Sequence, residues 1–156
     1  MATIHIIVGS VMGTAEALAN WIANELQSSP LNVRVNREFK AGELFNSADE
    51  VVLVCTSNTG MGDLPQNIQP LLTHIGNDYP AIAGRGYGII NLGDSSYPNF
   101  AQAGQTLNEA FADIGATLIG EPLVIDALDD QSPEQLCSAW LSSWVDQVNG
   151  FLEVSR

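Results

Sequence analysis

Short apolar segments alternate with amphipathic segments along this chain, and the alternation constrains the possible folds more than any other feature. Residues 3–8, 51–55 and 87–92 are strand-like runs, and 51–55 is almost entirely apolar and largely β-branched. A continuous apolar run of that kind is typical of a strand that is covered on both faces. Strands that alternate with helices predict a parallel sheet with helices packed on both sides.

The remaining segments complete this α/β pattern. Residues 32–37 form a short, partly polar strand, and the last strand spans 117–119 and 123–125 with an interruption around Gly120 and Pro122. The helical stripes are Ala15, Leu18, Ala19, Ile22 and Leu26; then Ile68, Leu71, Leu72 and Ile75; and then Leu107, Ala110, Phe111 and Ile114. By analogy with known doubly wound proteins, we expect a five-stranded parallel sheet of order 2-1-3-4-5. We expect one domain over residues 1–156, a length that suits a single core.

The last helix has the clearest start signal in the sequence. Ser132-Pro133-Glu134-Gln135 offers an N-cap hydroxyl, a proline at the first helical position and a glutamine for a capping box. Leu136, Trp140, Trp144 and Val148 follow on one face. At helical spacing, this tryptophan stripe predicts core packing rather than a cofactor site.

Charge and composition exclude several classes of function. Eighteen acidic residues face five basic ones, for a formal net charge of −13. A nucleic-acid partner needs a basic surface, which this composition does not supply, whereas acidity suits attraction to a basic partner protein. No apolar run approaches the ~20 residues of a membrane span, and the N-terminus lacks a secretory pattern. We therefore expect a cytoplasmic, monomeric protein with no nucleic-acid or membrane partner.

The cysteines and histidines do not suggest catalysis or metal binding. Cys55 lies in an apolar strand and Cys137 in a helical stripe, which predicts ordinary buried thiols. His5 and His74 have no companions at metal-ligand spacing. We assign neither a catalytic residue nor a metal.

The first loop at a strand end is Gly9-Ser10-Val11-Met12-Gly13-Thr14-Ala15, directly between a strand and a helix. Backbone N–H groups and the helix dipole at such a position favour an anion, and Ser10 and Thr14 add hydroxyl groups. The loop contains neither GxxxxGK nor GxGxxG, which argues against a P-loop nucleotidase and a Rossmann dinucleotide site. A phosphate site and a plain strand-to-helix turn both remain open at this point.

Two further loops follow the next buried strands. Residues 56–65 (TSNTGMGDLP) contain two glycines and small polar residues, which fits either an exposed binding platform or a structural turn. Residues 93–100 (GDSSYPNF) contain Tyr97, which either covers the core or stacks on a planar ligand. Together, the three loops outline a slot for a flat ring with a phosphate tail.

Three stretches carry a specific resemblance: GSVMGTAE at 9–16, SNTGMGDLP at 57–65 and LGDSSYPNF at 92–100. In this order and spacing, they resemble the short-chain flavodoxins of the MioC/YqcA type. They are also similar to the FMN domains of cytochrome P-450 reductase and sulfite reductase flavoprotein. The resemblance implies a flavodoxin-like fold and FMN as the cofactor.

The same resemblance implies the roles of individual residues. The FMN phosphate would be wrapped by Ser10, Val11, Met12, Gly13, Thr14 and Ala15. The isoalloxazine would be lined by Ser57, Asn58, Thr59 and Gly60, with Tyr97 stacked on its outer face, and the Gly60–Met61 peptide would rotate to accept a hydrogen bond from the reduced ring. The pocket would continue through Leu92, Gly93, Asp94, Asn99 and Phe100, with Asp129 in the last loop. The family usually has threonine where this chain has Met12, and often an aromatic residue where it has Thr59.

The function that the resemblance implies is one-electron transfer, from a flavodoxin/ferredoxin–NADP reductase to acceptor proteins, by a carrier rather than an enzyme. An NAD(P)H-dependent FMN quinone reductase on the same fold is the main alternative. A regulatory relative that binds FMN poorly is another. A phosphate-accepting receiver domain shares the strand order, but it needs an acidic cluster where this chain has Gly9-Ser10 and Thr56-Ser57.

Overall fold

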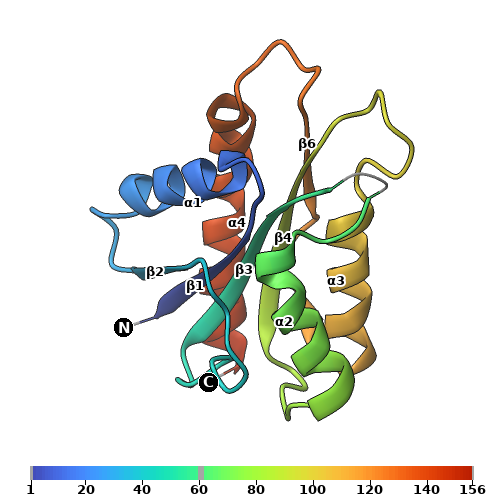
Figure 1. Cartoon of the computed structure of the whole chain (residues 1–156). Coiled ribbons are helices and arrows are strands. Elements are labelled where there is room, and N and C mark those ends of the chain that lie inside the picture. The colour runs from blue at the N-terminus through green and yellow to red at the C-terminus, as the bar shows by residue number, and fades with distance from the viewer. Residues whose placement is uncertain (1, 60–61, 156) are drawn as a thin grey trace.

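A twisted parallel sheet forms the middle of the molecule (Figure 1). The structure is a computed structural model, and it describes residues 2–59 and 62–155. The strands are β1 (Thr3–Gly9), β2 (Asn32–Asn36), β3 (Glu50–Ser57), β4 (Gly86–Gly93), β5 (Thr117–Leu118) and β6 (Leu123–Asp126). Their order is β2-β1-β3-β4-β5, and β6 also pairs with β4. Every pair of neighbouring strands is parallel.

Helices cover both faces of this sheet, as the alternation predicts. On one face lie α1 (Thr14–Glu25) and α4 (Pro133–Ser155), and on the other lie α2 (Gln69–Thr73) and α3 (Gln102–Asp113) (Figure 1). The short turns η1 (Gln66–Ile68) and η2 (His74–Asp78) flank α2. Residues 51–54 of β3 are fully buried, because β3 contacts helices on both sides and strands on both edges. The predicted α/β architecture, strand order and two-sided helix packing are confirmed.

The fifth position of the sheet differs in detail from a single strand. Its two halves are separate strands, β5 and β6, and both pair with β4. The predicted interruption therefore divides this position into two short strands, for a sheet of six strands rather than five. Gly120, with a φ of +70°, supports the break, since this backbone conformation is unfavourable for residues with a Cβ.

Two tryptophans of α4 hold this interruption in place. The indole N–H of Trp144 donates to the Ile119 carbonyl at 2.9 Å, and that of Trp140 donates to the Glu121 carbonyl at 2.8 Å. The two rings stack at 5.4 Å between centroids. Trp144 is buried, so the core role predicted from its spacing is confirmed.

The predicted start of α4 is also present. The Ser132 hydroxyl accepts a hydrogen bond from the Gln135 N–H at 3.2 Å, and the Gln135 side chain accepts one from the Ser132 N–H at 2.9 Å. This reciprocal pair is the capping box that the sequence indicates. It fixes the point at which the chain leaves the loop after β6 and enters α4.

His5 and Glu50 form a buried polar pair within the sheet. The Nδ1 atom of His5 lies 3.4 Å from the Glu50 carboxylate, and its Nε2 atom lies 3.1 Å from the Asn36 amide nitrogen. The Asn36 oxygen accepts from the Glu38 N–H, which identifies the nitrogen facing His5 as the amide donor. His5 Nε2 is therefore an acceptor, and His5 donates its Nδ1 proton to Glu50.

Glu50 makes the stability of the fold depend on pH. Burial raises the pKa of Glu50, but hydrogen bonds from His5 and from the Phe45 N–H (2.6 Å) outweigh burial, and the pKa lies below its ordinary value of 4.5. Because the pKa of Glu50 is lower in the folded state, its ionised form stabilises the fold when the pH is above the ordinary pKa. This stabilisation is lost as the pH falls through the pKa of the folded state.

We expect Glu50→Gln to lower the free energy of unfolding at pH 7 by roughly 1–3 kcal/mol. Between about pH 5 and 3, the free energy of unfolding of this variant should fall less than that of the parent protein. Urea unfolding at several pH values measures both effects. Glu153→Gln, an exposed change on α4, is the control and should leave both unchanged. An equal loss of stability with falling pH in E50Q and the parent would contradict this account.

Both cysteines are buried and free, as predicted. Burial raises the pKa of the Cys55 thiol well above its ordinary value and raises that of Cys137 to about 12. Both thiols are therefore protonated at neutral pH and are weak nucleophiles. Within the part of the chain that the structure describes, no helix combines the length and the apolar character needed to span a membrane.

Candidate functional site

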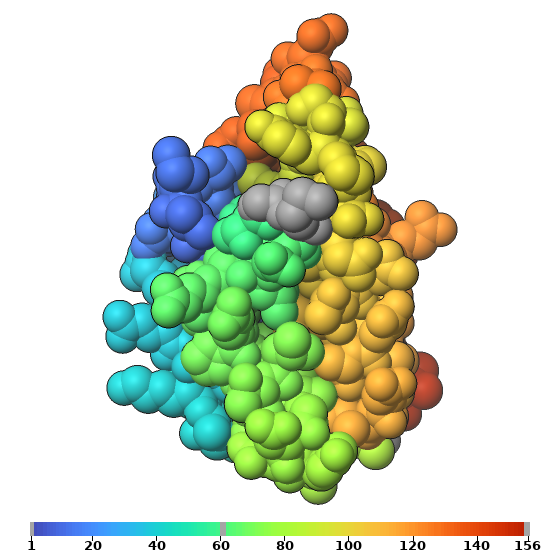
Figure 2. Space-filling view, turned by 45° about the vertical axis from the view of Figure 1, so that its right-hand side comes forward, coloured from blue at the N-terminus to red at the C-terminus, as the bar shows by residue number. Residues whose placement is uncertain are grey.

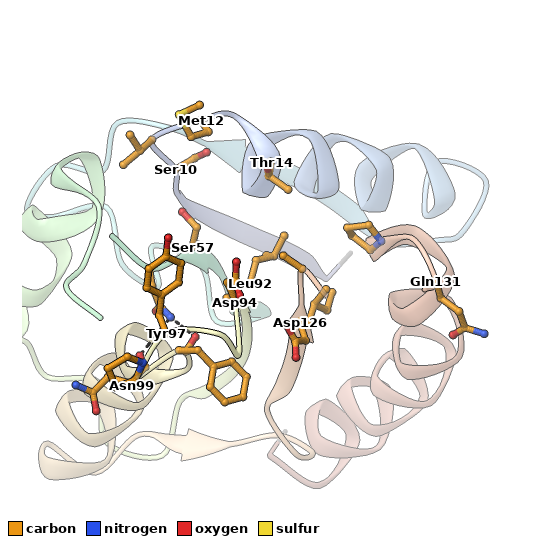
Figure 3. Close-up of a pocket in the computed structure, with 18 residues that line it drawn as sticks. Ser10, Met12, Thr14, Ser57, Leu92, Asp94, Tyr97, Asn99, Asp126 and Gln131 are labelled. Atoms are coloured by element: carbon orange, nitrogen blue, oxygen red, sulfur yellow. Dashed lines mark hydrogen bonds between the residues drawn. The ribbon is translucent and has the colours of Figure 1, made fainter. Parts of the chain in front are cut away.

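A cavity of about 570 Å³ lies at the carboxyl ends of β1, β3, β4 and β6. In a doubly wound sheet this edge, where the direction of winding changes, is the usual ligand site. The residues that line the cavity come from four loops and approach it from several sides (Figure 3). In Figure 2, the loops after β1 (blue), β4 (yellow) and β6 (orange) lie together at the upper end of the molecule.

The loop after β1 has the geometry of an anion site. Gly13, with a φ of +88°, turns the chain into α1, and the Ser10 hydroxyl accepts the Gly13 N–H at 2.8 Å. Because α1 begins at Thr14, the N–H groups of its first turn have no carbonyl partner within the helix. Ser10 and Thr14 both line the cavity, so their hydroxyl groups lie beside these free donors. Between the two alternatives left open by the sequence, this geometry favours a phosphate site.

This anion site depends on neutral donors rather than on positive side chains. Among the basic residues in the described part of the chain, Arg34, Arg37, Lys40 and Arg85, none lines the main cavity. Arg37 lines a second, smaller cavity on the other side of the Ser10 loop and forms an ion pair with Glu16. Met12, with 88% of its surface exposed, adds no donor from its side chain.

The loop after β3 is fixed to the loop after β4 by the Asn58 side chain. The Asn58 amide nitrogen donates to the Phe100 carbonyl, and its oxygen accepts from the Ala103 N–H at 3.1 Å and from the Asn91 amide at 3.2 Å. Asn91 is 1% exposed and also accepts the Gly104 N–H at 2.8 Å. Asn58 therefore lines the cavity but uses its amide to set the spacing of the two loops.

The two ends of the loop after β4, at Gly93 and Phe100, lie in close contact. A Cβ atom added to Gly93 would lie 1.9 Å from the Phe100 carbonyl oxygen, so only glycine fits this position. Tyr97 lies at the mouth of the cavity with 61% of its surface exposed (Figure 3). A half-exposed aromatic ring above a cavity is well placed to stack on a planar ligand.

A fourth loop, after β6, closes the cavity, and the sequence analysis missed most of it. The Asp126 carboxylate accepts hydrogen bonds from the Ser95 and Leu128 N–H groups, each at 3.0 Å. Hydrogen bonds from Ser95 and Leu128 hold the pKa of Asp126 below its usual value, so this side chain is ionised at neutral pH. The Ala127 N–H also donates to the Gly93 carbonyl at 2.7 Å. These bonds join the third and fourth loops.

Most of the predicted site residues meet in this cavity: Ser10, Val11, Met12, Thr14, Ser57, Asn58, Leu92, Gly93, Asp94, Tyr97, Asn99 and Phe100. The lining residues that were not predicted are Pro98, Ile125, Asp126, Ala127, Gln131 and Pro133. Pro98 lies within the predicted loop after β4, and the other five lie at or after the end of β6. The signal for these five in the sequence was the carboxyl end of the last strand, because the ends of all parallel strands meet at one edge.

The other predicted site residues lie elsewhere. Gly13 lines the second cavity, and Ala15 lies on the buried face of α1, in the core. Thr59 forms a β-bridge with Asp63 and does not line the main cavity. Asp129 also lies outside its lining and accepts the Gln131 N–H at 2.9 Å. Gly60 and the Gly60–Met61 peptide lie outside the described residues.

The cavity fits FMN better than a metal or a purely apolar ligand. Its volume falls within the ~300–1,000 Å³ of typical ligand sites. It has neutral anion donors at one end and apolar walls that include Leu92, Phe100 and Ile125. Within residues 2–59 and 62–155, no group of three or more His, Cys, Asp or Glu side chains could hold a metal ion.

Comparisons with known proteins identify the family of this chain. The flavodoxin family model matches residues 6–140. The chain is 38% identical to flavodoxin YqcA of Pectobacterium carotovorum, with 96% of this chain and 99% of that protein covered. It is 31% identical to the sulfite reductase [NADPH] flavoprotein alpha-component of Mannheimia succiniciproducens, with 97% of this chain and 25% of that longer protein covered.

The fold has solved counterparts of the same kind. The chain matches a cysteine-to-serine mutant of flavodoxin from Pseudomonas aeruginosa with a TM-score of 0.86 and 36% identity, covering 94% of this chain and 99% of that one. Family model, curated relatives and solved structure agree over nearly the whole chain, and they confirm the resemblance carried by the three loops. The protein is therefore a member of the flavodoxin family.

Proposed function

We propose that this protein forms one FMN-binding domain over residues 1–156 and carries single electrons from a reductase to acceptor proteins. FMN is the cofactor of the flavodoxin family, and it supplies a ring that accepts and releases electrons one at a time. The observation that carries the proposal is the cavity at the switch point, which combines the hydroxyl groups of Ser10 and Thr14 at the start of α1 with an aromatic residue at its open mouth.

In this proposal, each loop has a distinct task. The first-turn N–H groups of α1 and the hydroxyl groups of Ser10 and Thr14 bind the phosphate. Tyr97 stacks on the ring, and Leu92 and Phe100 contribute apolar contacts that exclude water. Asp126 keeps the last loop against the loop after β4. The chain thus provides binding, orientation and access, while the redox chemistry belongs to the cofactor.

The surface around the cavity fits a partner with a basic face. Four exposed large apolar side chains belong to the loops around the cavity: Val11, Met12 and Tyr97, which line it, and Leu128 in the loop after β6. Asp94 and Asp126 line the cavity beside them, and the chain carries a formal net charge of −13. An apolar centre with acidic surroundings favours fast, salt-sensitive encounters with a protein of opposite charge.

A reductase-coupled assay tests this function and separates it from the main alternative. We expect the FMN-loaded protein to be reduced by NADPH only when a flavodoxin/ferredoxin–NADP reductase is present, and to pass electrons on to cytochrome c. The rate should fall several-fold as salt rises from about 50 to 500 mM, because screening shortens the reach of surface charges. Rapid reduction by NADPH or NADH without any reductase would instead favour the quinone reductase alternative.

A further inference from the structure

Asn67 in η1 makes three hydrogen bonds, two of them to the end of β1 and the start of the Ser10 loop. Its side-chain oxygen accepts the Ser10 N–H at 3.0 Å, and its nitrogen donates to the Val8 carbonyl at 2.9 Å and to the Arg37 carbonyl at 3.0 Å. Two carbonyl acceptors and one N–H donor determine the orientation of the amide. Asn67 lines the smaller cavity beside the Ser10 loop and not the main cavity, and its bonds act on the backbone of that loop.

These bonds continue the hydrogen-bond ladder of β1 beyond the end of β2. The Asn32 N–H donates to the Ala2 carbonyl, and alternate residues of a parallel strand face the same neighbour. Val8 and Ser10 therefore face the side on which β2 lies, but β2 pairs with β1 only as far as Ile7. Here the Asn67 amide accepts one N–H and donates to the carbonyl two residues earlier, as the peptide groups of a further β2 residue would.

Because Asn67 takes the place of a β2 residue, it determines which backbone N–H groups remain free to bind an anion. The Ser10 N–H is occupied by Asn67, so it is not free for an anion, and this bond fixes the position of the Ser10 backbone. From that position the Ser10 hydroxyl reaches the Gly13 N–H at 2.8 Å, and the chain turns into α1. The anion is left with the first-turn N–H groups of α1 and the two hydroxyl groups, in a geometry that depends on Asn67.

We infer that Asn67 is a positioning residue for the phosphate end of the FMN site and has no equivalent role at the ring end. The inference rests on the proposed FMN site. The ring-side loops have their own positioning residue, Asn58, which bonds to Phe100 and Ala103. Loss of Asn67 should therefore weaken the binding of a ligand with a phosphate and leave the binding of the same ring without a phosphate nearly unchanged.

Titration of the apoprotein with FMN and with riboflavin tests this inference, because riboflavin has the same ring and lacks the phosphate. For Asn67→Ala we expect FMN binding to weaken about 10- to 100-fold, since lost bonds to one residue cost ~1–3 kcal/mol. Riboflavin binding should change by less than about threefold. Asn67→Ser, a milder change that cannot span all three partners, should shift the FMN-to-riboflavin ratio in the same direction.

Gln69→Ala is the matched control. Gln69 follows two residues later, and its side chain donates to the Leu64 carbonyl at 3.3 Å rather than to the Ser10 loop. It should leave the affinity ratio unchanged. If a folded Asn67 variant keeps the parent's ratio of FMN affinity to riboflavin affinity, because neither or both affinities change, the inference is wrong. If N67A does not fold, the same ratio is measured in N67S. Failure of the parent protein to bind FMN would instead contradict the proposed function itself.

Discussion

Replacing Gly93 with alanine is expected to weaken FMN binding about 100-fold. The new Cβ would lie 1.9 Å from the Phe100 carbonyl oxygen and 3.1 Å from the Asn58 amide nitrogen, both of which belong to the loops that form the cavity. The backbone at Phe100 has to move, since a carbonyl group cannot rotate away as a flexible side chain can. Overpacking of this kind costs about 1–3 kcal/mol, and about 2.7 kcal/mol corresponds to a hundredfold change in affinity.

Calorimetric titration of the purified apoprotein with FMN measures this effect. Gly150→Ala is the matched control, because beyond its chain neighbours and the nearby backbone of α4 nothing lies within 4 Å of the Cβ that it would add. The control should bind FMN as the parent does. FMN affinity in G93A within threefold of the parent would show that the contact between Gly93 and Phe100 does not shape the site.

Replacing Trp144 with alanine is expected to produce the largest loss of stability, about 3–5 kcal/mol. Trp144 is 1% exposed and packs against β4, where a Cβ at Gly88 would lie 2.6–2.7 Å from the indole ring. The absence of a side chain at Gly88 creates the space that the indole fills. Alanine would leave a cavity there and would also leave the Ile119 carbonyl without its indole donor.

Urea unfolding of Trp144→Ala and Trp144→Phe separates these two contributions. Phenylalanine retains much of the apolar volume but loses the hydrogen bond to Ile119, so we expect W144F to lose only about 1–2 kcal/mol. A loss below about 1 kcal/mol in W144A would contradict a core role for this residue. A loss in W144F equal to that in W144A would assign the effect to the hydrogen bond rather than to packing.

Features that depend on neighbouring residues in the sequence were predictable. The capping box at Ser132 and Gln135 and the helical stripe that places Trp144 in the core both follow from short-range spacing. The three loops at the strand ends were equally clear, because glycines and small polar residues directly follow apolar runs. These patterns, together with the analogy to doubly wound proteins, were sufficient to predict the sheet and most of the cavity.

Features that depend on contacts between distant residues were not predictable. Nothing around Asn67 indicates that its side chain continues the ladder of β1, because that role exists only where β2 stops short of the end of β1. The position of Asp126 at the end of the last strand was visible in the sequence, but its bond to the Ser95 N–H of another loop was not. Thr59, assigned to the ring by resemblance, forms a β-bridge with Asp63, a contact that the sequence alone did not indicate.

Titration of the apoprotein with FMN, followed by absorbance in the visible range and by flavin fluorescence, measures directly whether this chain binds its cofactor. We expect the apoprotein to bind one FMN with a Kd at or below about 1 μM, which corresponds to a binding free energy near −8 kcal/mol. Stacking on Tyr97 should quench flavin fluorescence in the complex. If the flavin absorbance and fluorescence show no sign of binding up to about 1 mM FMN, the proposal that this protein binds FMN is wrong.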